Sequence, residues 1–115
     1  MITVVQLVAQ AVAAGLTLDA DDRGALVIRG PATAGPLAEA LVTREAAVGR
    51  TLDVVNGRAP VLDWKDARSA PRRSRCVLCG NPAALLCPYE PTPTAMHKTC
   101  AEAFLLRARR KGRSA

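Results

Sequence analysis

Apolar residues near the start of the chain recur at the spacing of an α-helix. Val5, Val8 and Val12 fall three or four positions apart, which places them on one helical face. Thr3 can cap the start of such a helix, and Gly15 is a natural stop. The pattern therefore predicts an amphipathic helix that ends at Gly15.

The following positions alternate between apolar and polar residues, with the period of a β-strand. The alternation runs over residues 16–20 and again over residues 25–29, and the turn-forming residues 21–24 lie between them. A second helical pattern begins at Pro36, and Gly49 is a point at which it can divide. We expect a helix, a β-hairpin and then one or two helices.

This order, together with particular residues, resembles a known type of domain. The segments Ala14-Gly15-Leu16, Leu18-Asp19 and Gly24-Ala25-Leu26-Val27-Ile28-Arg29-Gly30-Pro31 are similar to the TubC-type N-terminal docking domain of polyketide and non-ribosomal peptide synthetases. The resemblance covers roughly residues 3–55. It implies an αββαα fold whose exposed hairpin accepts a short tail of a protein partner. The partner-binding surface that it implies consists of Leu16, Leu18, Arg23, Leu26, Ile28 and Arg29.

The middle of the chain has the composition of a linker. Residues 56–73 contain the turn-forming pair Asn56-Gly57 and two prolines, and they end in a polar, basic stretch. Trp64 is the one large apolar side chain in this segment. We expect it to dock on a neighbouring domain, with partner binding as the alternative.

All four cysteines and the single histidine lie between residues 76 and 100. Cys76 and Cys79 form a C-x2-C pair, and His97 and Cys100 form an H-x2-C pair. Two such pairs supply the four ligands that a structural zinc ion prefers, so the spacing predicts one zinc ion per chain. Cys87 is the alternative to His97 as a ligand, although it follows an apolar run in which cysteine is often a small buried side chain.

The zinc prediction has two rivals, a disulfide pair and free thiols. A disulfide needs an oxidising compartment, and the first fourteen residues lack the basic start of an export signal. We therefore expect a cytoplasmic protein without a membrane segment. The second pair precedes a run of strong helix formers. This layout resembles a treble-clef zinc finger, and the ligand spacing is similar to the first zinc site of a LIM domain.

Charge is unevenly distributed along the chain. Residues 1–58 carry a net charge of −1, whereas residues 59–115 carry +7. Two basic clusters flank the zinc ligands in sequence, and they are either a solvated surface or a phosphate-binding patch. The nucleic-acid-binding candidates are Arg72, Arg73, Arg75, Arg107, Arg109, Arg110, Lys111 and Arg113. The preference for arginine over lysine, with abundant alanine, valine, glycine and proline, indicates a bacterial or phage genome rich in GC.

The sequence as a whole predicts an α+β protein in three parts. These are a docking-like αββαα domain over residues 1–55, a linker over residues 56–73 and a zinc module over residues 74–115 that ends in a basic helix. A histidine held by zinc leaves no catalytic triad, and no phosphate-binding loop is present. We expect a non-enzymatic zinc-binding adaptor with a protein partner and no small-molecule substrate. The alternative is a small basic zinc-finger protein that binds nucleic acid, and a homodimer remains open.

Overall fold

The computed structural model describes residues 2–59, 61–90 and 92–114, with side chains described up to residue 110. The described part contains a two-stranded antiparallel sheet and five α-helices, so the protein is small and of the α+β class. In chain order the elements are α1 (Val4–Ala13), β1 (Thr17–Ala20), β2 (Leu26–Arg29), the 3₁₀ turn η1 (Ala32–Ala34), α2 (Gly35–Val42), α3 (Glu45–Gly49), α4 (Leu52–Val55) and α5 (Lys98–Ser114).

Both ends of α1 are fixed by local chemistry that the sequence predicts. The hydroxyl of Thr3 accepts a hydrogen bond from the backbone N–H of Gln6, and the Gln6 side chain accepts one from the backbone N–H of Thr3. This capping box satisfies two N–H groups that the helix would otherwise leave unpaired. At the other end Gly15 adopts a φ of +94°, and the Leu16 N–H donates to the carbonyl of Ala11. The left-handed residue ends the helix.

The hairpin forms with β1 and β2 in the predicted places. Leu18 pairs with Ile28 and Ala20 with Leu26 across the sheet. The side chain of Asn56 donates to the carbonyl of Leu18, so the backbone polar groups of Leu18 face away from β2. In an antiparallel pair, two residues directly opposite each other either exchange backbone hydrogen bonds or both point them outward. The backbone polar groups of Ile28 therefore face away from β1.

The segment after the hairpin contains three short helices instead of one or two. Helix α2 ends at Val42, α3 ends at Gly49, and α4 begins at Leu52. Gly49 is therefore one of two division points, because the chain also turns between α2 and α3. The buried hydroxyl of Thr51 donates to the carbonyl of Val48 and stabilises the second turn.

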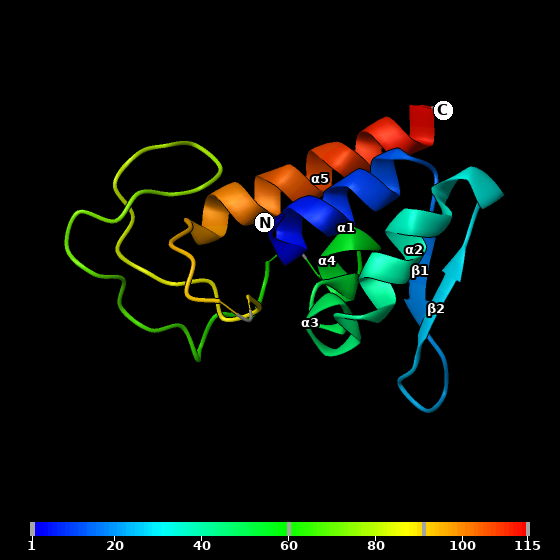
Figure 1. Cartoon of the computed structure of the whole chain (residues 1–115), viewed down its shortest axis with the longest axis horizontal. Helices are drawn as coiled ribbons and strands as arrows, with labels where there is room; N and C mark the ends of the chain where they lie inside the picture. Colours follow the sequence, from blue (N-terminus) through cyan, green and yellow to red (C-terminus); the bar gives the residue numbers. More distant parts are fainter. Residues whose placement is uncertain (1, 60, 91, 115) are drawn as a thin grey trace.

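Helix α5 lies along α1, so elements from both ends of the chain are neighbours (Figure 1). Ala101, Leu105 and Ala108 on α5 are buried in the same apolar core as Val4 and Val8 on α1. The core thus draws on both expected domains. The exact division at residues 55 and 73 stays a prediction.

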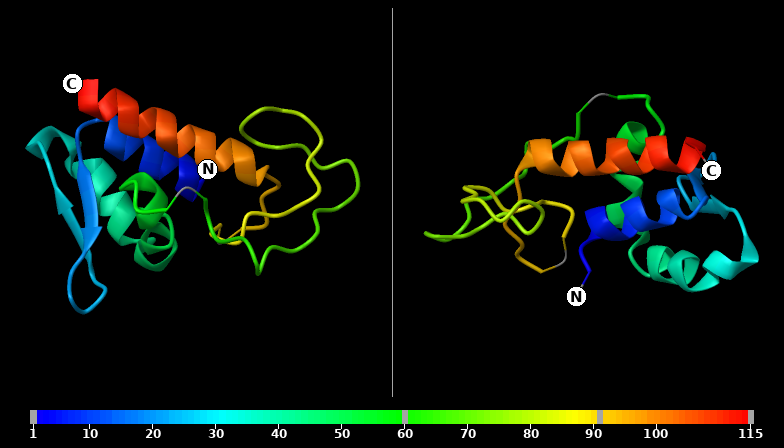
Figure 2. Two further views of the ribbon diagram at one scale, coloured as in Figure 1. Left: turned by 180° about the vertical axis from the view of Figure 1, so that it is seen from behind. Right: turned by 90° about the horizontal axis from the view of Figure 1, so that it is seen from above.

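The long irregular segment between α4 and α5 lies at the end of the molecule where α5 starts. The view from behind shows its loops extending past the start of α5 (Figure 2). Three isolated antiparallel bridges organise the described part of this segment, and they pair Ser69 with Leu85, Arg75 with Pro82 and Leu86 with Ala95. Trp64 is 8% exposed and belongs to the common core, which agrees with the expectation that it docks.

Candidate metal centre

Four side chains from the two sequence pairs meet at one point beside the start of α5. One donor atom from each of Cys76, Cys79, His97 and Cys100 lies within 4.8 Å of the other three. We call this group the Cys/His cluster. Zinc ligands sit about 2.0–2.3 Å from the ion, so sulfurs at the corners of a tetrahedron are about 4 Å apart. The donor types and their spacing fit a zinc ion.

A tight turn aims the first pair. The N–H of Gly80 donates to the carbonyl of Cys76 across 2.8 Å, and Gly80 takes a φ of +78° to close the turn. The turn is held at its base, because the Cys76 N–H donates to the carbonyl of Asn81. Residues other than glycine rarely adopt this φ. Gly80 therefore helps to set the position of the Cys79 sulfur.

The second pair is placed by the start of α5. His97 lies just before the helix and Cys100 is in its first turn, where residues three apart share a face. The Nε2 atom of His97 lies 2.8 Å from the carbonyl of Pro82, which can only accept, so Nε2 carries the proton. The Nδ1 atom is left with its lone pair, and it lies 3.3 Å from the Cys79 sulfur and 3.4 Å from the Cys100 sulfur. This is the tautomer that a metal ligand needs.

The thiols of the cluster have unequal affinity for protons. Burial raises the pKa of Cys76, but backbone N–H groups of His97, Cys79 and Leu78 outweigh it and bring the pKa to about 6. Burial and the neighbouring cysteines raise the pKa of Cys100 to about 11. A thiolate at one cysteine therefore opposes deprotonation of the next. A divalent cation among the sulfurs would offset this repulsion between thiolates.

Cys87 lies outside the Cys/His cluster. Its side chain is 4% exposed, and burial raises its pKa to about 11. Its backbone N–H donates to the carbonyl of Thr94, within the pairing that brings the two halves of the loop together. These observations favour the role of a small buried side chain.

The predicted partner-binding residues divide into two groups. Leu16 and Leu18 are buried in the core, because β1 turns this face toward the helices. Leu26 and Ile28 on β2 are half-buried, and Arg23 and Arg29 are exposed. Only the β2 and turn residues are thus open to a partner in this structure.

Among the described side chains, the two basic clusters lie toward opposite ends of α5. Arg72, Arg73 and Arg75 are exposed near the end of α5 that carries the Cys/His cluster, and Arg75 donates to the carbonyl of Gly80. Arg107 and Arg110 are exposed near the other end of the helix, whereas Arg109 is half-buried. The side chains of Lys111 and Arg113 lie outside the described residues.

Contacts that hold the long segment between α4 and α5 in place have no signal in the sequence. The side chain of Glu102 accepts a hydrogen bond of 2.7 Å from the backbone N–H of Leu62. The hydroxyl of Tyr89 donates to the carbonyl of Asp63 at the same distance, and the guanidinium of Arg50 lies 4.6 Å from the centre of the Tyr89 ring. Polar residues at such large sequence separations carry no spacing rule that could have identified them.

Within the described residues, no helix is long and apolar enough to cross a membrane. Comparisons of the chain with protein-family models, with curated proteins and with solved structures found no match, so the docking-domain resemblance receives no support from a family model.

Proposed function

We propose that this protein is a non-enzymatic adaptor in which a zinc ion at the Cys/His cluster orders the C-terminal part and a groove beside β2 binds a protein partner. The observation that carries the zinc part is the convergence of three sulfurs and a correctly oriented imidazole. With the turn at Gly80, the paired loop and the following helix, the segment from residue 74 onward would be a treble-clef-like module.

The adaptor part is supported by a groove between β2 and α2. Its volume is about 500 Å³, and its lining consists of Leu26, Ile28, Ala38, Glu39, Val42 and Thr43. Val42 is 55% exposed, so the apolar lining of this groove is accessible to a partner. We call this the β2–α2 groove.

An extended peptide is the occupant that fits the backbone beside this groove. The polar backbone groups of Ile28 face away from β1, the side on which an added strand would pair, whereas the N–H of Leu26 on the same edge donates to the Glu45 carboxylate. A strand added there gains main-chain hydrogen bonds, and its alternate side chains would enter the groove. The exposed cations Arg23, in the hairpin turn, and Arg29, at the end of β2, would meet acidic groups of the partner.

The test is binding of an array of short peptides with alternating apolar and acidic residues, before and after a change in the groove. We expect Val42→Asp to abolish capture, because it places a carboxylate where the apolar side chains dock. Val61→Asp is the matched control, since Val61 is 53% exposed and lies outside the groove. Charge reversal at Arg23 and Arg29 should weaken the binding of the same peptides.

Equal effects of Val42→Asp and Val61→Asp would refute the groove as the binding site. The nucleic-acid alternative is a distinct outcome of the same measurements. Binding to phosphates falls steeply as salt is raised, whereas binding in an apolar groove does not. Tight, salt-sensitive binding to DNA or RNA that survives Val42→Asp would replace the adaptor proposal.

A further inference from the structure

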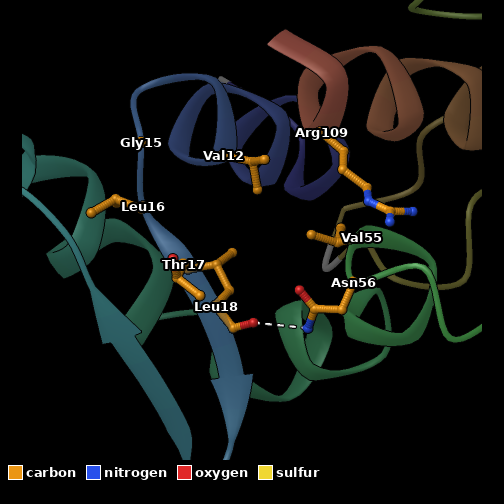
Figure 3. A pocket seen from close by; sticks show the side chains of 8 residues that line it. All are labelled: Val12, Gly15, Leu16, Thr17, Leu18, Val55, Asn56 and Arg109. Carbon is orange, nitrogen blue, oxygen red and sulfur yellow. Dashed lines mark hydrogen bonds between the residues drawn. The ribbon is translucent and has the colours of Figure 1, made fainter. Parts of the chain in front are cut away.

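A pocket of about 240 Å³ lies at the end of the molecule away from the Cys/His cluster, where α1, β1, α4 and α5 approach one another (Figure 3). Its apolar wall is made of Val12, Leu16, Leu18 and Val55. Its polar groups come from Thr17, Asn56 and Arg109, and the backbone of Gly15 completes the lining. Drug-sized ligands use roughly 300–1,000 Å³, so this pocket suits a smaller molecule or a single side chain with its end group. We call it the Arg109 pocket.

Arg109 differs from the other arginines of its helix. Arg107 and Arg110 are exposed, but Arg109 is half-buried, and its side chain runs from α5 past Val55 (Figure 3). Its guanidinium lies against the backbone of Gly57, so closely that a methyl group on Gly57 would lie about 2.6 Å from its central carbon. Gly57 thus provides both the turn, with a φ of +76°, and the space in which the guanidinium lies.

No carboxylate of the described residues forms an ion pair with Arg109. Arg58, which follows Gly57 in the chain, contacts Asp19 at 3.2 Å and Asp53 at 3.1 Å. A half-buried guanidinium without an acidic partner retains its full capacity to bind an anion, and its fork of N–H groups matches a carboxylate in two parallel hydrogen bonds.

The charges nearby decide between kinds of anion. Arg58 is shared between two aspartates, so the group of three is net negative and offers no second cation to a ligand. Among the side chains that the structure describes, Arg109 is the one cation that lines the pocket, so a phosphate dianion would have a single guanidinium to offset both of its charges. A carboxylate carries a single charge, and the adjacent wall of valine and leucine side chains accommodates an apolar body next to it.

From this arrangement we infer that the Arg109 pocket binds a carboxylate attached to a compact aliphatic group, with Arg109 on the carboxylate and Val12 and Val55 against the aliphatic part. The source is either a small aliphatic acid or the C-terminal residue of a polypeptide. The inference goes beyond the proposed adaptor function, because the pocket shares no residue with the Cys/His cluster or the β2–α2 groove.

The experiment is an NMR titration of the full-length protein with three probes, N-acetyl-leucine, its amide and isovalerate. N-acetyl-leucine should bind in the millimolar range, as small ligands with one charged contact do, and shift the amide signals of Thr17, Asn56 and Gly57. The amide should bind at least about ten-fold more weakly, because it cannot pair with the guanidinium. If isovalerate binds with the same affinity as N-acetyl-leucine, the source is a free acid. A clear preference for N-acetyl-leucine identifies a chain end.

Two pairs of variants locate the site. Arg109→Gln should weaken N-acetyl-leucine binding about ten-fold, whereas Arg68→Gln, which removes an exposed charge elsewhere, should not. Gly57→Ala should weaken binding because the methyl group displaces the guanidinium. Gly24→Ala is its control, since Gly24 has a similar φ of +81° and open space around it.

Equal binding of the acid and the amide to the unaltered protein would overturn the inference, and so would full binding by Arg109→Gln. The comparison of acid and amide needs no variant, so it decides the matter even if a substitution impairs folding. Failure here leaves the zinc and groove proposals untouched, because their tests use other residues.

Discussion

The carboxylate of Glu90 accepts a hydrogen bond of 2.6 Å from the backbone N–H of Val4, which lies 86 residues earlier in the chain. Val4 is the first residue of α1, whose N-terminal N–H groups need acceptors. Glu90 lies in the loop that connects the two pairs of the Cys/His cluster. The contact therefore joins the loop of the metal centre to the first turn of the N-terminal helix.

The first prediction concerns the neutral form of this side chain. Burial raises the pKa of Glu90, and this effect exceeds the opposing effects of the N–H groups of Val4 and Val5. Folding therefore disfavours the charged form of Glu90 relative to the unfolded chain. We expect Glu90→Gln to match or exceed the stability of the unaltered protein at neutral pH, whereas Glu90→Ala should lose about 1–2 kcal/mol because the helix loses an acceptor. Urea unfolding of the two variants measures the difference.

The pH dependence provides an internal control. A carboxyl group with a raised pKa in the folded state binds its proton more tightly there, so its contribution to stability is largest in acid and falls as pH rises through the folded pKa. The stability of the unaltered protein relative to Glu90→Gln should therefore decrease with rising pH and then level off. A relative stability that increased with pH would show that the charged carboxylate is the stabilising form.

The second prediction tests the ligand assignment. His97→Ala leaves three sulfurs, so zinc affinity should fall by orders of magnitude when measured by competition with a chelator. Cys87→Ala removes a buried thiol outside the cluster, and zinc affinity should stay close to that of the unaltered protein. Metal analysis of the purified protein should give close to one zinc per chain. A larger loss of affinity from Cys87→Ala than from His97→Ala would reverse the assignment.

The third prediction follows zinc removal with the single tryptophan as a reporter. Trp64 is 8% exposed, and its neighbour Asp63 accepts the hydrogen bond of Tyr89 from the loop that the cluster organises. A chelator should loosen this loop, expose the indole and shift its fluorescence to longer wavelength. Restoring zinc should reverse the shift. An unchanged spectrum in a protein proved free of zinc would mean that apolar packing alone holds the segment.

The fourth prediction separates backbone strain from steric conflict at the Arg109 pocket. Gly57→Ala and Gly24→Ala both place a side chain at a positive φ, which should cost each variant about 1 kcal/mol of stability. The methyl group at position 57 also meets the guanidinium of Arg109, but that group is the end of a flexible side chain and can move aside. Thermal unfolding should thus show similar losses, while ligand binding differs. A much larger loss at position 57 would indicate that the guanidinium is held rigidly.

The sequence by itself determined the local structures, because their causes are local. Thr3 and Gly15 define the ends of α1 through hydrogen bonds within a few residues, and the alternation around the turn at residues 21–24 places the hairpin. The spacing of the cysteines and His97 also identified the cluster, since a metal site brings short-spaced pairs together. The preference for His97 over Cys87 also followed from the sequence, because His97 forms a short H-x2-C pair with Cys100.

The tertiary structure decided what depends on residues far apart in sequence. It places α5 along α1, buries Leu16 and Leu18 on the inner face of the hairpin, and moves Arg109 from the basic tail into a pocket against Gly57. The contacts of Glu90 and Glu102 belong to the same class. Burial and contacts across long sequence separations depend on which amphipathic faces pack against each other. The periodicity of the sequence determines which residues share a face, but it does not determine the element against which that face packs.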